Sequence, residues 1–106
     1  MTFPLPQPAA RAIGAFGRDL SLARRRRRIS QASMAERMGV GLATLKRLEK
    51  GDPRVAFETV ARALHVLGEI DRLNKLLDTR DDVLGLALMD AQLPVRVRRR
   101  KTTGGL

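Results

Sequence analysis

The chain has 106 residues, enough for one small hydrophobic core and a tail but not for two independent domains. Its 21 Lys and Arg outnumber its 11 Asp and Glu, and the resulting formal charge of +10 favours a polyanionic partner, nucleic acid before an anionic membrane surface. The absence of cysteine excludes disulfides and thiolate metal sites. Three Phe are the only aromatic residues, which disfavours binding of single-stranded RNA because such binding relies on aromatic side chains that stack on bases.

The first eight residues are predicted to form an extended, flexible arm, because prolines stand at positions 4, 6 and 8. The same prolines interrupt the apolar run that a secretion signal requires. The longest apolar stretch, Val83 to Met89, is too short to span a bilayer. We therefore expect a cytoplasmic protein with no membrane partner.

The first predicted helix runs from Ala9 to about Arg27. Apolar residues recur along it at steps of three and four, which places them on one buried stripe: Ile13, Phe16, Leu20 and Ala23. Five consecutive arginines, residues 24–28, finish this helix, where cations suit the negative end of the helix dipole. Because consecutive positions point all around a helix, only about two or three of them can face one DNA backbone.

Residues 30–51, SQASMAERMGVGLATLKRLEKG, have the spacing of a helix-turn-helix. Ser30 can cap a first helix over residues 31–38, and Gly39 supplies the left-handed residue that ends it. After a short turn the pattern becomes helical again over residues 42–50.

The second helix of this motif has two distinct faces. Leu45 and Leu48 share the buried face, and the opposite face carries the cations Lys46, Arg47 and Lys50. A short helix that is anchored by leucines and carries cations outward suits a DNA major groove, where Arg or Lys can reach guanine edges.

Three further helical segments are predicted after the motif, over residues 57–67, 70–77 and 83–92. Asp82 can cap the last segment, and Pro94 ends it. The sequence therefore predicts an all-α protein. A five-helix DNA-binding domain over residues 9–78 is followed by residues 79–106, a helical or extended basic segment for dimerisation or partner binding.

The motif and its surroundings, roughly residues 11–68, resemble the family of the phage repressors and Cro, the XRE family. The likeness rests on Ser30, Gln31, Met34, Ala35, Gly39, Val40, Thr44, Leu45, Leu48, Glu49, Lys50 and Gly51. It implies a phage-repressor-like domain with Met34, Ala35, Leu45 and Leu48 in its core. Two residues depart from the family: Ser33 leaves the capping box of Ser30 half made, and Gly41 replaces the usual Ser or Thr cap of the recognition helix.

The resemblance implies how the protein contacts double-stranded DNA. The family reads base edges from the positions of Leu42, Ala43, Thr44, Lys46 and Arg47. Arg47 is the strongest candidate because it can bind guanine bidentately, whereas Leu42 and Ala43 can read only a thymine methyl group or shape, or simply pack. Lys50 and Arg54 occupy positions that contact the sugar-phosphate backbone, and Gln31 occupies one that contacts a phosphate or a base. Each of the three is otherwise a solvated surface residue.

Glu49 differs from these residues because its negative charge would be repelled by the phosphates of DNA. In the family an acid at this position pairs with a cation at the position of Arg24 and holds the helices in register; otherwise Glu49 is simply exposed. The lone His65 is expected to be an exposed helical residue. We find no phosphate-binding glycine loop, no nucleophile with a base and no metal-ligand spacing, so no enzyme, cofactor or metal is expected.

Residues 67–101 resemble the C-terminal part of HipB-type antitoxins, small repressors that are encoded beside HipA-type kinase toxins. The likeness rests on the leucine-rich helix after Gly68, on residues 81–88 and on the basic residues 93–98. It implies a homodimer that binds palindromic operators in its own promoter and holds a HipA-like kinase in a non-productive state. The residues themselves support only dimerisation, because six leucines exceed what so small a unit can cover: Leu73, Leu76, Leu77, Leu84, Leu86 and Leu88.

The tail, residues 93–106, alternates valine and arginine before a basic run. It is compatible with an edge strand, an arm in the minor groove, a leash that raises only non-specific affinity, or a segment inserted into a partner. With Pro94 at its start and no pairing strand in sight, we expect disorder in isolation.

Three functions therefore compete. The first is a dimeric repressor that acts as an antitoxin, and the second is a stand-alone regulator of the same fold without a toxin. The third is a protein-interaction module in which the helix-turn-helix is only a scaffold and the charge recruits an acidic partner.

Overall fold

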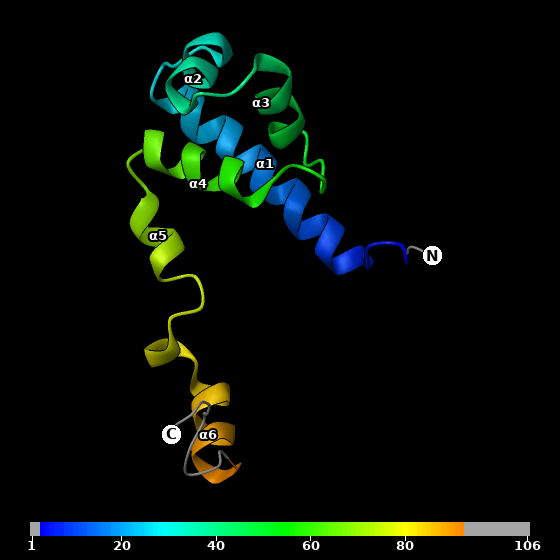
Figure 1. The fold of residues 1–106 in the computed structure, drawn as a ribbon, viewed down its shortest axis with the longest axis vertical. Coiled ribbons are helices and arrows are strands. Elements are labelled where there is room, and N and C mark those ends of the chain that lie inside the picture. The colour runs from blue at the N-terminus through cyan, green and yellow to red at the C-terminus, as the bar shows by residue number, and fades with distance from the viewer. Residues whose placement is uncertain (1–2, 93–106) are drawn as a thin grey trace, which may run out of the picture. The chain divides into compact units, whose positions relative to one another are not determined.

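The computed structural model describes residues 3–92, and in this part of the chain it contains helices and no strand (Figure 1). The elements are α1 (Gln7–Arg26), α2 (Gln31–Met38), α3 (Leu42–Glu49), α4 (Phe57–Val66), α5 (Ile70–Asn74), the short 3-10 helix η1 (Thr79–Asp81) and α6 (Val83–Gln92). The predicted all-α fold is confirmed. Two units, residues 1–73 and 74–106, make up the chain. The predicted boundary after Asp78 therefore lies inside the second unit.

The first unit is built around α1, with α3 packed against it and α2 packed against both α3 and α4 (Figure 1). Eight apolar side chains form its buried core: Leu20, Met34, Ala35, Met38, Leu45, Leu48, Ala63 and Leu67. The four core residues predicted in the helix-turn-helix are among them. Phe16 and Ala23 of the predicted α1 stripe are partly buried against this core.

The start of α1 differs from the prediction. The helix begins at Gln7, so the predicted arm through Pro8 ends at Pro6, which has an extended conformation with φ −56° and ψ 143°. Pro8 is the second helical residue, where the missing N–H has no partner within the helix in any case. The predicted arm is therefore too long by two residues, because a proline is tolerated in the first turn of a helix.

The end of α1 is a Schellman motif. The N–H of Ile29 donates to the carbonyl oxygen of Arg24 at 3.2 Å, and the N–H of Arg28 donates to that of Arg25 at 2.9 Å. Arg28 occupies the left-handed position of this motif with φ 55°. It is the residue type, not the geometry, that is unusual, because glycine is favoured there.

Two glycines bring α1 and the end of α3 into backbone contact. A Cβ atom on Gly17 would lie 2.6 Å from the carbonyl oxygens of both Leu48 and Glu49. Gly51 has φ 79°, and a Cβ there would lie 2.7 Å from the Cα of Gly14. This approach fixes where α3 begins and ends relative to α1, and the apolar stripe of α1 does not predict it.

The fifth helix is shorter than predicted, because α5 ends at Asn74 and not at residue 77. Leu76 and Leu77 are 72% and 87% exposed, so no packing stabilises a continuation of the helix over them. A short helix in water is marginal without such packing.

In the second unit, side-chain caps set the helix starts. Asp78 accepts a hydrogen bond from the N–H of Arg80 at 2.9 Å and begins η1. Asp82 accepts from the N–H of Gly85 at 2.9 Å, which confirms it as the cap of the last helix. Pro94 and the tail, residues 93–106, lie outside the described residues.

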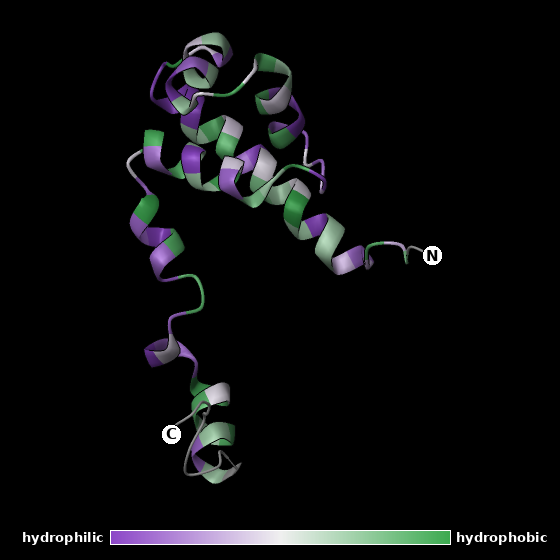
Figure 2. Cartoon of the chain, in the orientation of Figure 1, coloured by the Kyte–Doolittle hydropathy of each residue, from purple (hydrophilic) through white to green (hydrophobic). Residues whose placement is uncertain are grey.

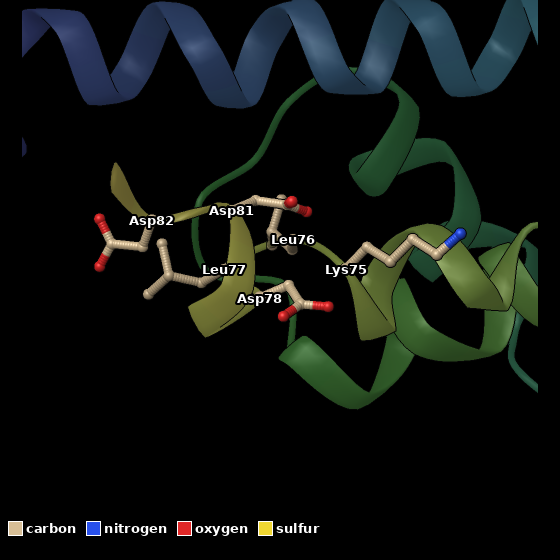
Figure 3. Close-up of a pocket in the computed structure, with 6 residues that line it drawn as sticks. All are labelled: Lys75, Leu76, Leu77, Asp78, Asp81 and Asp82. Atoms are coloured by element: carbon tan, nitrogen blue, oxygen red, sulfur yellow. The ribbon is translucent and has the colours of Figure 1, made fainter. Parts of the chain in front are cut away.

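The described surface of α6 is apolar and largely exposed (Figure 2). Its exposed apolar side chains are Val83, Leu84, Leu88 and Met89. Beside η1 lies a small open cavity of about 190 Å³, lined by Lys75, Leu76, Leu77, Asp78, Asp81 and Asp82, in which the Lys75 side chain extends away from Asp82 (Figure 3). Since Asp78 and Asp82 already act as helix caps, we assign no ligand to this cavity.

Candidate nucleic-acid interface

The turn between α2 and α3 is set by local residues. Ser30 Oγ accepts a hydrogen bond from the N–H of Ser33 at 3.1 Å and caps α2. Gly39 ends α2 with φ 74° and ψ 33°, and the N–H of Val40 reaches back to the carbonyl oxygen of Ala35 at 3.0 Å. Gly41 caps α3 without a side-chain hydrogen bond, as its residue type predicts.

The recognition helix α3 buries two of its three leucines and exposes its cations. Leu45 is fully buried and Leu48 is 4% exposed. The side chains on the other side are exposed: Leu42, Ala43, Lys46, Arg47 and, at the C-cap, Lys50. This outer face is available to a macromolecular groove in the free chain.

Thr44 and Arg47 interact across one turn of α3. The guanidinium Nη2 of Arg47 donates to Thr44 Oγ1 at 3.2 Å, and Thr44 is half-buried while Arg47 is exposed. The hydroxyl therefore restrains the guanidinium without covering it. A restrained guanidinium loses less conformational freedom when it binds an acceptor pair.

Arg24 and Glu49 form the predicted ion pair. Arg24 Nε donates to Glu49 Oε2 at 2.7 Å and Nη2 donates to Oε1 at 3.1 Å, and the two side chains are only 8% and 6% exposed. The remaining nitrogen, Nη1, donates to the carbonyl oxygen of Ile29 at 2.8 Å. One guanidinium thus connects the end of α1, the loop before α2 and the last residue of α3.

The pKa of Glu49 reports the strength of these contacts. Burial by itself raises the pKa, but hydrogen bonds from Arg24, Gln31 and Ser21, together with the charge of Arg24, outweigh it and hold the pKa below its ordinary value of 4.5. Glu49 is therefore ionised at neutral pH.

Gln31 is a structural neighbour of the ion pair. Its Nε2 donates one hydrogen bond to Glu49 Oε1 at 2.9 Å from a half-buried position, so the alternative of a fully solvated side chain is wrong. A primary amide has two N–H donors, and this hydrogen bond uses one of them. The sequence alone did not predict the contact to Glu49, which requires the folded juxtaposition of α2 and α3.

Beyond α3, Asp52 organises the loop that carries Arg54. Asp52 Oδ1 accepts from the N–H of Arg54 at 2.9 Å and from its Nε at 3.3 Å. These hydrogen bonds, the backbone one first, lower the pKa of Asp52 from its ordinary value of 3.8. The Arg54 side chain is 86% exposed, so Asp52 orients an accessible cation. Asp52 was not singled out from the sequence, although its spacing to Arg54 is typical of an Asx turn.

The remaining observations on residues 3–92 concern His65, metal ligands and membrane-spanning helices. His65 is exposed as predicted, and the residues described contain no group of His, Cys, Asp or Glu arranged to hold a metal ion. No helix in that range has the length and apolar character needed to cross a membrane.

This geometry, with a leucine-anchored second helix that presents cations outward, defines a helix-turn-helix protein. Residues 15–77, more than half of the chain, match the family model described as "Helix-turn-helix domain", and the chain belongs to this family. It therefore carries an XRE-like helix-turn-helix DNA-binding domain, a kind of domain typical of transcriptional regulators. No curated protein and no solved structure matches the chain.

Proposed function

We propose that the protein is a homodimeric transcriptional repressor that reads a palindromic operator with α3 and acts as the antitoxin of a HipA-like kinase toxin. One observation carries the DNA-reading part of the proposal. Leu45 and Leu48 of α3 are buried, while Lys46 and Arg47 on the outer side of the helix and Lys50 at its C-cap remain exposed.

Base recognition is assigned to the exposed face of α3. Arg47 is proposed to bind the O6 and N7 atoms of a guanine, with Thr44 restraining its guanidinium at 3.2 Å. Lys46 can reach a second guanine, and Thr44 is a further candidate for a base edge. Leu42, which is 40% exposed, and Ala43 offer only apolar contact, which suits a thymine methyl group.

Contacts to the sugar-phosphate backbone are assigned to three residues around α3. Lys50 and Arg54 are exposed cations that follow the recognition helix. Gln31 keeps one amide N–H for a phosphate while the other is bound to Glu49. Such contacts position the protein and carry no sequence information by themselves.

Dimerisation is assigned to the apolar surface that begins at α5. Four of the six predicted leucines are strongly exposed in the single chain: Leu76, Leu77, Leu84 and Leu88. Leu73 and Leu86 are half-buried and would contribute less area. Two-fold pairing would bury this surface and place two α3 helices in half-sites about one helical turn of DNA apart.

The antitoxin role rests on the resemblance of residues 67–101 to HipB-type antitoxins. The family match ends at residue 77 and leaves most of that segment uncovered. We therefore assign the operator to α3 and the toxin to residues 79–106.

The decisive experiment is to purify the native protein from its host and footprint the resulting complex on the promoter upstream of its gene. We expect a kinase to co-purify and a symmetric protected site whose occupancy falls steeply with salt. A symmetric footprint without a kinase would favour a stand-alone regulator. Tight binding of another protein together with sequence-blind DNA binding would favour an interaction module instead.

A further inference from the structure

The five arginines at the end of α1 differ in what they contact. Arg24 is buried against Glu49, and Arg27 donates to the carbonyl oxygen of Ala23 at 2.9 Å and pairs with Glu69 at 3.3 Å. The other three side chains are exposed and make no hydrogen bond or ion pair to any residue that the structure describes: Arg25, Arg26 and Arg28.

Arg28 is also unusual in its backbone. The helices α2, α3 and α4 are each followed by a left-handed glycine, Gly39, Gly51 and Gly68, whereas α1 is followed by a left-handed arginine. An L-residue with a Cβ atom is less stable than glycine in this conformation. The Arg28 side chain makes no hydrogen bond or ion pair to a described residue, so no such contact within the described chain accounts for an arginine at this position, and a bound partner offers one.

The position of these arginines relative to α3 is fixed. Arg24 holds the carbonyl oxygen of Ile29 and the carboxylate of Glu49 with one guanidinium, so the loop that follows Arg28 is tied to the end of the recognition helix. Three residues along the chain from Arg28 is Gln31, which reaches the same carboxylate. An extended chain spans at most about 11 Å over this separation, so the Cα of Arg28 lies within that distance of Gln31, a residue of the proposed interface.

We propose that Arg25, Arg26 and Arg28, the arginine corner, bind phosphates of the DNA backbone that flank the half-site read by α3. Guanidinium groups bind phosphate oxygens bidentately and are weakly hydrated, which suits this role. The inference rests on the proposed DNA-binding function. The arginine corner adds affinity and fixes register, but it does not add sequence choice.

The test compares two variants with equal loss of charge. Arg25→Gln/Arg28→Gly removes two groups of the arginine corner, and the control Arg11→Gln/Arg18→Gln removes two exposed arginines from the earlier part of α1. Affinity for a duplex of the upstream promoter and for a random-sequence duplex is measured from about 50 mM to about 200 mM salt. The oligomeric state of each variant is checked by sedimentation.

Each phosphate contact contributes about 0.9 to the slope of log affinity against log salt, and a bound dimer of the arginine-corner variant lacks four such contacts, so it should lose about 3.6 from the wild-type slope. Over this fourfold salt range the wild-type affinity should then fall about 150-fold more than that of the variant. The control should keep the wild-type slope. Arg28→Gly alone should raise the urea midpoint while weakening DNA binding, which separates lost contact from lost folding.

Equal salt slopes for the two double variants would show that the arginine corner does not bind phosphates of the DNA backbone. If Arg47→Ala still abolishes sequence choice in that case, the proposed function stands without it. Failure of the wild-type protein to bind either duplex would overturn both. Loss of a co-purified protein partner with an unchanged salt slope would assign these arginines to an acidic protein surface and also overturn the inference.

Discussion

Glu49 is a carboxylate held almost out of water by partners from two other helices. Arg24 supplies two N–H donors from α1, and Gln31 supplies one from the start of α2. Because each partner belongs to a different element, the carboxylate fixes the end of α3 against both. The orientation of the recognition helix therefore depends on a residue that does not face DNA.

We expect Glu49→Ala to destabilise the fold by about 3–5 kcal/mol, because it leaves Arg24 buried without a counter-charge. Glu69→Ala is the matched control, since its pair with Arg27 is about a third exposed and should contribute about 0–1 kcal/mol. Urea unfolding followed by circular dichroism measures both. Equal, small losses would show that the buried pair does not hold the fold together.

The same residue predicts a pH dependence. Because the folded-state pKa of Glu49 lies below its ordinary value of 4.5, its contribution to stability is fully present above that value and is lost as the pH falls through the folded-state pKa. The difference in unfolding free energy between wild type and Glu49→Gln should be constant near neutral pH and shrink below about pH 4.5. If the difference in unfolding free energy grows as the pH falls, the folded-state pKa of Glu49 is not lowered.

Among the helices, the close approach of α1 to α3 requires a glycine at position 17 of α1 but not at position 14. We expect Gly17→Ala to destabilise the fold by about 1–3 kcal/mol, because its Cβ would lie 2.6 Å from two backbone carbonyl oxygens. Gly14→Ala meets only the Arg18 guanidinium at 3.5 Å and should gain about 0.5–1 kcal/mol in helix propensity. Thermal unfolding of the two variants checks this, and a shift of both in the same direction would contradict it.

Elements whose ends are encoded locally could be predicted from sequence. The bounds of α2 follow from Ser30 and Gly39, and Asp82 marks the start of α6 in the same way. The end of α5 was misplaced because it depends on whether Leu76 and Leu77 find packing, which no local pattern states.

The same distinction applies to the candidate interface. The cationic face of α3 follows from helical periodicity, and the pair of Arg24 with Glu49 was expected from the family resemblance. The contacts of Gln31 with Glu49 and of Gly17 with the α3 backbone join residues far apart in sequence, so they emerge only in the folded chain. The orientation of Arg54 by Asp52 was missed although its signal is local.

The whole molecule is proposed to act as a dimer of two identical chains. We expect Leu84→Gln/Leu88→Gln to shift the protein from dimer to monomer, because these side chains are 71% and 51% exposed one helical turn apart on α6. Leu5→Gln, at an exposed leucine of the first unit, is the control and should leave the dimer intact. Analytical ultracentrifugation reads the outcome. A monomeric wild type, or a double variant that stays dimeric, would remove α6 from the interface.

If the outer face of α3 reads duplex DNA, substitutions on it change how well the protein discriminates between sequences. The measurement is the ratio of its affinities for a selected operator and for a random duplex. Arg47→Ala should lower this ratio about 5- to 150-fold for each half-site, equivalent to about 1–3 kcal/mol for each bidentate guanine contact that the dimer loses. Lys50→Ala, which removes a phosphate contact, should weaken binding to both duplexes and leave the ratio unchanged. If the ratio is unchanged in Arg47→Ala while the wild-type protein discriminates between the two duplexes, the outer face of α3 does not read the bases through Arg47.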